Sequence, residues 1–393
     1  MDDCLQVDLV ASILTLYDTL PFQPQPRQYT VLASFSLVSR ASSKIVSVAT
    51  GTKCLPANKL PADGEALHDS HAEVLARRGA VRWFLQEVQR STDTTNTVQS
   101  EWLHRCPDGK YALKPHARLV LYVSTVPCGD ASMRFLAASQ DAQMAALKDA
   151  SVTLRAPADP SAAARGRDNY ALWGVLRTKP ARADAPTTAS MSCSDKIAAW
   201  SFLGIQGALG AKFLHPLYID SMIIGEVPAE LRHVIREDCE RALWRRIEDC
   251  GPYSLHKPPI HFTDIPFVHS RSMIQDVGGS CNDSICWVAD STKPAEIIIN
   301  GFKRGVPPKN RHREQSRPET CRKSMLQLYH ETLHACGLPQ APDVATLRDI
   351  KHSAGDYHVA KDSLIGGGGL FCGWIRGSTI DFDTLTPRAH KLH

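Results

Sequence analysis

The sequence contains no hydrophobic run long enough to cross a membrane, so we expect no membrane partner. It also lacks an N-terminal segment in which basic residues precede an apolar core, and it begins with Asp2 and Asp3, unlike a secretory or mitochondrial leader. Twelve cysteines are present, but they are scattered without the tight framework of a disulfide-rich secreted domain. These absences predict a protein that is not secreted and works in a reduced intracellular compartment, the nucleus or the cytoplasm.

A strong charge of either sign is also missing. The formal net charge of +4 permits nucleic-acid binding but does not by itself indicate it. The glycine run at 366–369 lacks the Lys-Ser/Thr that completes a phosphate-binding loop, so it predicts a turn. The sequence indicates no Ser-His-Asp or Cys-His nucleophile set, which leaves water as the expected nucleophile.

Hydrophobic residues make up 43% of the 393 residues, enough to bury a substantial core. Helical and strand-like patterns alternate, which favours an α/β fold with helices on both faces of a sheet. The region 91–117 is polar and weakly patterned, and we expect it to be a surface connection. The expected helices cover 3–20, 72–90, 130–148, 228–249, 318–335 and 342–364, and the expected strands cover 29–38, 44–49, 118–126, 218–227 and 297–299.

The stretch DSHAE at 69–73 opens an amphipathic helix. Asp69 and Ser70 are good N-cap residues, and apolar residues follow at helical spacing. His71 and Glu73 would then lie in the first turn. A metal ion over the open end of a helix can be reached from both sides, so this turn can supply one ligand and one acid/base group.

Two cysteines complete the pattern. Cys128 stands in PCGD, directly after the strand expected at 118–126, and Cys193 stands in SCSDK, before another helical stretch. One histidine and two thiolates suit zinc and leave its fourth position for water. Zinc nucleobase deaminases use this ligand set with a glutamate that does not bind the metal. Their usual signature is P-C-x-x-C, but Ala131 replaces its second cysteine here, so the third ligand must come from far along the chain.

Together these motifs resemble the adenosine deaminases that act on RNA and their relatives that edit tRNA, and above all the eukaryotic tRNA-specific adenosine deaminase 1 family. The resemblance covers most of the chain and is carried by TGTKC at 50–54, HAE at 71–73, PCGD at 127–130, LRTKP at 176–180, MSCSDKIA at 191–198 and GIQG at 204–207. It implies that 1–393 form a single adenosine-to-inosine RNA editase domain. The expected fold is a cytidine-deaminase-like three-layer α/β core with a helical C-terminal extension.

The resemblance also implies the reaction, the zinc-dependent hydrolytic deamination of adenosine to inosine in tRNA. The implied target is adenosine 37, next to the anticodon of alanine tRNA. His71, Cys128 and Cys193 would bind zinc, which lowers the pKa of a bound water towards about 7. Glu73 would take the proton of that water, pass it to N1 of the purine, and relay a second proton as ammonia leaves C6.

RNA contacts are expected at two places. The basic loop LRTKPAR contains Arg177, Lys179 and Arg182, and from composition alone it would be a solvated surface loop. In RNA-editing relatives the corresponding loop approaches the nucleic acid beside the flipped base. The resemblance also implies that Thr52 and Lys53 meet ribose and phosphate, which would make binding sensitive to salt.

The resemblance further implies a second cofactor, inositol hexakisphosphate, which relatives bury beneath the active site. A buried polyanion needs a cage of cations, because unpaired buried charges are very costly. Two positions depart from some relatives, with His68 in place of Asn and Ala199 in place of Arg. The matching positions are Arg77, Arg78, Lys196, Lys323, Lys351, Tyr357, Lys361 and Trp374.

Two other functions stay open at the level of sequence. A deaminase of the same core could act on another RNA or on a mononucleotide, with a different pocket. A non-catalytic tRNA-binding adaptor would be expected to have lost the proton-shuttling residue, yet Glu73 is present. No separate double-stranded-RNA-binding module is evident, which argues against an editor of long duplexes.

Overall fold

A computed structural model describes residues 3–92, 99–138, 163–166, 170–179, 188–249, 253–311, 313–340 and 346–375. Its centre is an eight-stranded mixed sheet in the order β10-β9-β6-β2-β3-β12-β13-β14. The strand β9 runs parallel to β6 and β10, whereas the other neighbours are antiparallel. The strands are β2 (Leu32–Val38), β3 (Ser43–Thr50), β6 (Arg118–Val123), β9 (Ser221–Ile224), β10 (Ile260–Phe262), β12 (Asp283–Val288), β13 (Ala295–Ile299) and β14 (Phe302–Lys303).

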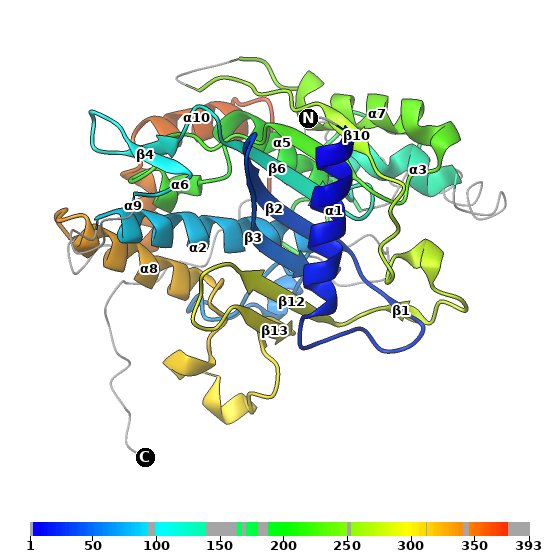
Figure 1. Cartoon of the computed structure of the whole chain (residues 1–393), viewed down its shortest axis with the longest axis horizontal. Coiled ribbons are helices and arrows are strands. Elements are labelled where there is room, and N and C mark those ends of the chain that lie inside the picture. The colour runs from blue at the N-terminus through cyan, green and yellow to red at the C-terminus, as the bar shows by residue number, and fades with distance from the viewer. Residues whose placement is uncertain are drawn as a thin grey trace.

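Helices cover both faces of this sheet (Figure 1). On one face α1 (Asp3–Asp18) buries Ile13 and Tyr17 against side chains of β2, β3 and β6. On the other face α2 (Ala72–Thr92) and α5 (Cys193–Leu203) pack into a larger apolar core, and α8 (Arg322–Ala335) lies against α2. Side chains alternate between the faces of each strand, so both layers share one sheet. The expected three-layer α/β fold is confirmed.

The C-terminal helices form a third apolar cluster with α5. The helices α9 (Leu347–His352) and α10 (Asp356–Ile365) replace the continuous pattern expected at 342–364, because Gly355 takes a φ of 51° between them. From this cluster Leu364 and Phe371 pack against Phe202 of α5. The remaining helices are α3 (Met133–Ala138), α6 (Gly207–Gly210) and α7 (Arg232–Glu240), and single helical turns occur at Ala57–Lys59, Asp130–Ser132, Ala229–Leu231, Arg241–Arg245, Arg271–Met273, Pro308–Asn310 and Glu314–Ser316.

One expectation about the fold is wrong. The part of 91–117 that the structure describes is not a plain surface connection, because it contains the hairpin of β4 (Leu103–Arg105) and β5 (Tyr111–Leu113) and buries Trp102. The helix expected after PCGD is described only as α3, and its continuation lies outside the described residues. Two short parallel pairs complete the strands, β1 (Gln28–Tyr29) with β11 (Gly279–Ser280) and β7 (Ala164–Arg165) with β8 (Arg177–Thr178). Among the described residues, no helix is long and apolar enough to span a membrane.

Gly51 joins the end of β3 to the start of α2. Its carbonyl accepts the backbone N–H of Ala72 at 3.0 Å, and its φ is 147°. A Cβ at this position would lie 2.0 Å from the carbonyl oxygen of Ser70. Only glycine therefore allows the strand to pass so close to the residues that precede the helix.

We expect Gly51→Ala to lower the free energy of unfolding by about 2–5 kcal/mol, because it adds overpacking to backbone strain. Gly305→Ala is the matched control, since Gly305 also has a positive φ, 83°, but a Cβ there meets nothing within 4 Å. It should cost only the strain, about 1–3 kcal/mol. Urea unfolding of both variants measures the difference, and equal losses would contradict the close approach.

Candidate active site

His71 and Glu73 lie at the N-terminal end of α2. The Asp69 side chain accepts the backbone N–H of His71 at 3.0 Å, and this capping bond fixes the entry into the helix. Glu73 follows in the first turn and is buried, with 3% of its surface exposed. The helix start therefore brings an imidazole and a carboxyl group to one end of the sheet's larger core.

The two cysteines lie close together because the backbone of the loop after Cys128 packs against side chains of the loop that contains Cys193. Cys128 follows β6, and the next residue, Gly129, has a φ of 113°. A Cβ on Gly129 would lie 2.1 Å from Oγ of Ser192, so the loops can approach this closely only with glycine there. Ser194 reinforces the contact, because its backbone N–H donates to the carbonyl of Cys128 at 2.9 Å. Cys193 is thereby held beside Cys128 as the first residue of α5.

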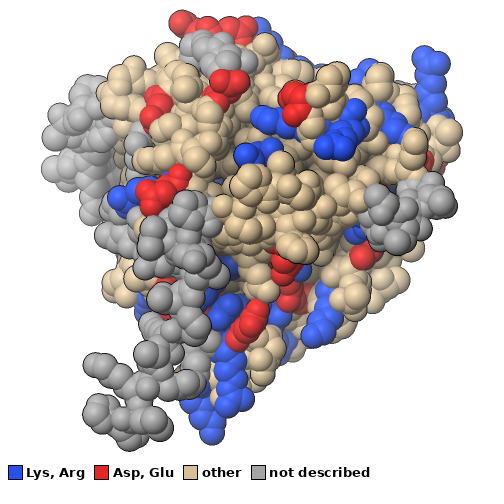
Figure 2. All heavy atoms as spheres, turned by 90° about the vertical axis from the view of Figure 1, so that its left-hand side faces the viewer, with Lys and Arg blue, Asp and Glu red and all other residues tan. Residues whose placement is uncertain are grey.

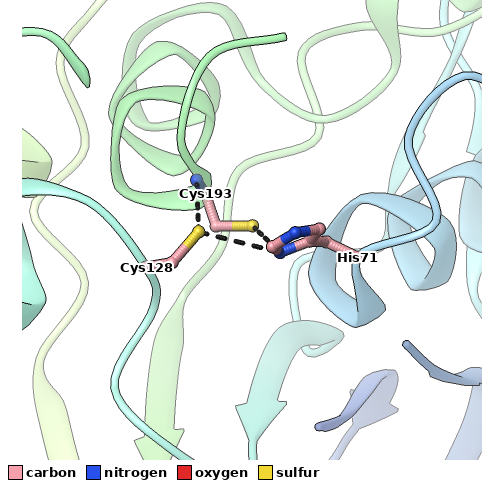
Figure 3. Close-up of side chains that lie close together, drawn as sticks. All are labelled: His71, Cys128 and Cys193. Atoms are coloured by element: carbon pink, nitrogen blue, oxygen red, sulfur yellow. Dashed lines mark hydrogen bonds between the residues drawn. The ribbon is translucent and has the colours of Figure 1, made fainter. Parts of the chain in front are cut away.

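Three side chains from these distant segments converge (Figure 3). The Nδ1 atom of His71 lies 3.7 Å from Sγ of Cys128 and 3.6 Å from Sγ of Cys193. In a tetrahedral zinc site, Zn–S and Zn–N bonds place sulfur and nitrogen about 3.5 Å apart. The donor types and their separations therefore fit a zinc ion, and the described cluster contains three protein ligands.

The ionisation of Cys128 agrees with a ligand role, since metals bind thiolates. Burial, followed by the hydrogen bond with Cys128, instead raises the pKa of Cys193 above its usual range. A hydrogen bond with Cys193, together with the nearby His71 and Lys179, lowers the pKa of Cys128 well below its usual range. The backbone N–H of Cys193 also points at Sγ of Cys128, at 3.4 Å. These contacts stabilise negative charge on the sulfur.

Glu73 lies outside the three-residue cluster but close enough to Cys128 and His71 to interact with them electrostatically. Its Oε2 atom is buried and has no hydrogen-bond partner. Burial, followed by the nearby Cys128, raises the pKa of Glu73 above its ordinary value. A raised pKa makes the carboxyl group a better proton acceptor than an ordinary glutamate, which is the direction a general acid/base needs.

A buried ion-pair network stands behind the ligands. The ammonium group of Lys179 donates to both carboxylate oxygens of Asp69, at 3.0 and 2.8 Å, and lies 3.3 Å from Sγ of Cys193. Lys196 and Ser190 also donate to Asp69. Burial alone would raise the pKa of Asp69, but the two lysines hold it well below its usual range. The network thus places a positive charge beside a ligand sulfur.

Two of the residues expected to contact RNA are buried in this structure. Lys179 is 3% exposed, and its ammonium group is occupied by Asp69. Arg177 has no exposed surface, and its guanidinium group donates to the carbonyls of Gly166 and Leu172. Both side chains point into the protein, so neither reaches an RNA ligand in this structure. The third basic residue of that loop, Arg182, lies outside the described residues.

Thr52 and Lys53 lie next to the helix start. The hydroxyl of Thr52 is buried without a hydrogen-bond partner. Lys53 lines a cavity of about 460 Å³ together with Ser70, Phe302 and Arg311. Their predicted contact with RNA stays a prediction, but Lys53 borders a cavity that Ser70, just before His71, also lines.

The residues predicted to hold a polyanion are spread over several helices. Arg77 and Arg78 of α2 donate to the carbonyls of Ile205 and Thr320. Burial, followed by the like charge of Arg322, lowers the pKa of Arg78 to about 10. Burial also raises the pKa of Tyr357, which lies close enough to Arg77 for the two to interact. In this region, burial and neighbouring like charges therefore make the charged forms of these side chains less stable than they are in water.

Other members of that set are placed differently. Lys323 forms an ion pair with Glu65 at 3.1 Å, which already neutralises it. Lys351, Lys361 and Trp374 are half-buried on and after the C-terminal helices. Sequence reasoning missed Arg322, whose pKa is lowered by burial. Its position as the first residue of α8, next to Lys323, was the only available signal.

The unpaired Glu73 carboxyl yields a stability prediction. A raised pKa in the folded state means that ionisation of Glu73 lowers the free energy of unfolding. This destabilisation is absent below the ordinary pKa near 4.5 and complete above the folded-state pKa. Glu73→Gln should therefore raise the free energy of unfolding at pH 7.5, by about 1–3 kcal/mol, the usual cost of one unsatisfied buried group. The gain should shrink as the pH falls towards 4.5.

Urea unfolding of both proteins across this pH range, after zinc has been removed by a chelator, measures the effect, because a bound cation would itself favour the ionised carboxylate. The control is Glu230→Gln, at an exposed position, where we expect a change below about 0.5 kcal/mol at neutral pH. A Glu73→Gln variant that is less stable than the native sequence at pH 7.5 would show that the carboxylate has a stabilising partner.

Comparisons with known proteins identify the family of this chain. The chain is 30% identical to tRNA-specific adenosine deaminase 1 of Schizosaccharomyces pombe, over 82% of this chain and 84% of that protein. It is 32% identical to tRNA-specific adenosine deaminase 1 of Drosophila melanogaster, over 77% and 76%. The double-stranded RNA-specific editase Adar of the same fly is also 32% identical, but over only 55% of this chain and 32% of that protein. Residues 47–377 match the family model of the adenosine-deaminase (editase) domain, and the chain therefore belongs to that family.

Proposed function

We propose that this protein is a zinc-dependent enzyme that converts adenosine to inosine in tRNA by hydrolytic deamination. The observation that carries the proposal is the convergence of His71, Cys128 and Cys193, with the unpaired carboxyl of Glu73 beside them. The relatives that match along most of their length are named tRNA-specific adenosine deaminases. The match to the double-stranded RNA editase covers a smaller part of that protein, so a tRNA substrate is favoured.

The proposed chemistry is hydrolysis at C6 of the purine, with water consumed and ammonia released. Zinc bound by His71, Cys128 and Cys193 would supply Lewis acidity that lowers the pKa of a water molecule. Glu73 accepts the proton of that water and delivers it to N1 of the purine, and it then carries the second proton to the departing amino group. Its raised pKa suits both directions of transfer.

The Asp69 network would hold the ligand set in place. Lys179 lies against Sγ of Cys193, and a cation there stabilises the thiolate without competing for the metal position. Asp69 in turn fixes both Lys179 and the backbone of His71. One carboxylate thus orients two of the three ligands, which is the task of residues that surround a metal site.

Adenosine 37 of alanine tRNA is the proposed target, on the strength of the family resemblance. A base in the anticodon loop is a reasonable substrate, because extrusion costs least where a base is not paired. Thr52 and Lys53 are the proposed contacts to ribose and phosphate, and the cavity that Lys53 lines supports this for Lys53. Arg182 is proposed as a further phosphate contact.

Inositol hexakisphosphate is proposed as a second cofactor. What supports it is the group of half-buried cations Arg77, Arg78 and Arg322, in which burial, followed by the like charge of Arg322, lowers the pKa of Arg78. A buried polyanion would relieve both the burial cost and the repulsion. Lys196 could link this region to the zinc ligands, because it binds Asp69. We further propose that 1–393 act as one deaminase unit in the nucleus or cytoplasm.

The reaction can be tested by incubating the purified full chain with bulk tRNA that lacks inosine 37, followed by mapping of inosine. We expect inosine at position 37 of alanine tRNA. Glu73→Gln should lose at least about 100-fold in rate, the usual contribution of a general acid/base. The same variant should keep its zinc, because Glu73 is not a ligand. Full activity of Glu73→Gln, or inosine absent from all tRNAs, would refute the proposal.

The cofactor is tested separately by denaturing the purified protein and measuring inositol phosphates in the supernatant. We expect about one inositol hexakisphosphate per chain. Arg78→Gln should lower that amount, because it removes a half-buried cation, whereas Arg348→Gln on the exposed side of α9 is the control and should not. Release of no inositol phosphate would refute the cofactor and leave the zinc chemistry standing.

A further inference from the structure

A second group of metal-ligating side chains lies at the turn of the β4–β5 hairpin. The chain segment after α6 runs alongside this hairpin at one end of the molecule (Figure 1). The N–H of Tyr111 donates to the carbonyl of Phe213 at 2.8 Å, and the N–H of His215 donates to the carbonyl of Tyr111 at 2.8 Å. These bonds fix His215 beside the turn, although more than one hundred residues separate them in the sequence.

The turn itself presents two more donors towards His215. Ligand atoms of Cys106, Asp108 and His215 all lie within 4.8 Å of one another. The Nε2 atom of His215 is 3.2 Å from Oδ2 of Asp108. A fourth candidate, His104, has its Nε2 atom 3.7 Å from Sγ of Cys106. The last distance equals that between His71 and Cys128 in the active site.

The backbone of the turn holds these donors in place. The N–H of Cys106 donates to the carbonyl of Lys110 at 2.7 Å, and the N–H of Gly109 donates back to the carbonyl of Cys106 at 3.0 Å. Gly109 takes a φ of 85°, and the N–H of Lys110 donates a hydrogen bond to Oδ1 of Asp108 at 3.1 Å. The arrangement therefore does not depend on flexible side chains alone.

An ordinary ion pair between Asp108 and His215 would account for two of the donors, both of which are partly exposed. It does not account for the thiol and second imidazole that gather at the same turn. One sulfur, one imidazole nitrogen and one carboxylate oxygen are all donor types that zinc binds, and three protein ligands leave a fourth position for water or for His104. Calcium and magnesium prefer oxygen ligands throughout, so the donor set disfavours them.

The surroundings also favour a small cation over a nucleic acid. Asp108 and His215 lie at the wall of a cleft of about 1300 Å³. The end of the molecule that carries the hairpin shows acidic as well as basic side chains, interspersed with uncharged surface (Figure 2). Such a mixed surface lacks the field of a single sign that attracts a polyanion.

We propose that Cys106, Asp108 and His215 form a second zinc site, with His104 or water as the fourth ligand. The ion would clamp the β4–β5 hairpin to the segment that follows α6. The site uses none of the residues of the deaminase centre, so it does not depend on the proposed catalytic function. Its role is structural, because all protein ligands sit on a turn and an adjoining segment that it would tie together.

The test compares the zinc content of the full chain and its variants after saturation with zinc and removal of free metal, measured by mass spectrometry. Cys106→Ser and His215→Gln should each hold about one zinc per chain fewer than the native sequence. Cys336→Ser is the matched control, since Cys336 lines the same cleft but is not in the ligand group, and it should lose none. Deamination should persist in the two test variants.

Circular dichroism confirms that each variant is folded, and His215→Gln decides the matter if Cys106→Ser does not fold. Substitution with cobalt gives a second measurement, in which Cys106→Ser should lose the thiolate-to-cobalt absorption of one sulfur. Equal zinc content in the native chain and in His215→Gln would overturn the proposal. A loss of zinc that also occurs in Cys336→Ser would overturn it as well, since it would not be specific to the cluster.

Discussion

The buried carboxylate of Asp69 is the interaction on which the site depends. A charge with only 6% exposure is tolerable only if it is paired, and the ammonium groups of Lys179 and Lys196 pair it. The same carboxylate caps the backbone at His71, so removing its partners would disturb the start of α2. Because Lys179 also contacts Cys193, one buried anion connects three segments that are distant in the sequence.

This constraint explains why the loops around the site approach so closely. Glycine at 51 and at 129 lets backbone pass within van der Waals distance of Ser70 and Ser192. Side chains there would push the helix start away from the cysteine loops and stretch the Asp69 contacts. The two effects act together. The absence of a Cβ at the two glycines lets the segments approach one another, and the ion pairs of Asp69 then hold them in place.

The sequence predicted the three side chains that converge because their chemistry is local and their residue types are rare. His71, Glu73 and Cys128 each stand at an expected element boundary, and the family motifs supplied Cys193. The same reasoning misjudged Arg177 and Lys179, since a basic loop has the composition of a solvated surface. Their burial follows from partners far along the chain, Asp69 and the carbonyls around Gly166, which no local pattern reveals. The β4–β5 hairpin was missed for a related reason, because its strands are three residues long and show little alternation.

Several polar and charged groups in and around the site have no partner of opposite charge among the residues that the structure describes. Glu73 carries an unpartnered oxygen, two thiols and an imidazole converge, and the half-buried Arg78 lies close to the like charges of Arg322 and Arg77. Each feature opposes folding of the chain alone and favours binding of a species of the opposite charge. A ligand that binds only the folded state adds its binding free energy to stability. Metal and polyanion binding would then convert these incomplete groups from a cost of folding into part of what holds the folded state together.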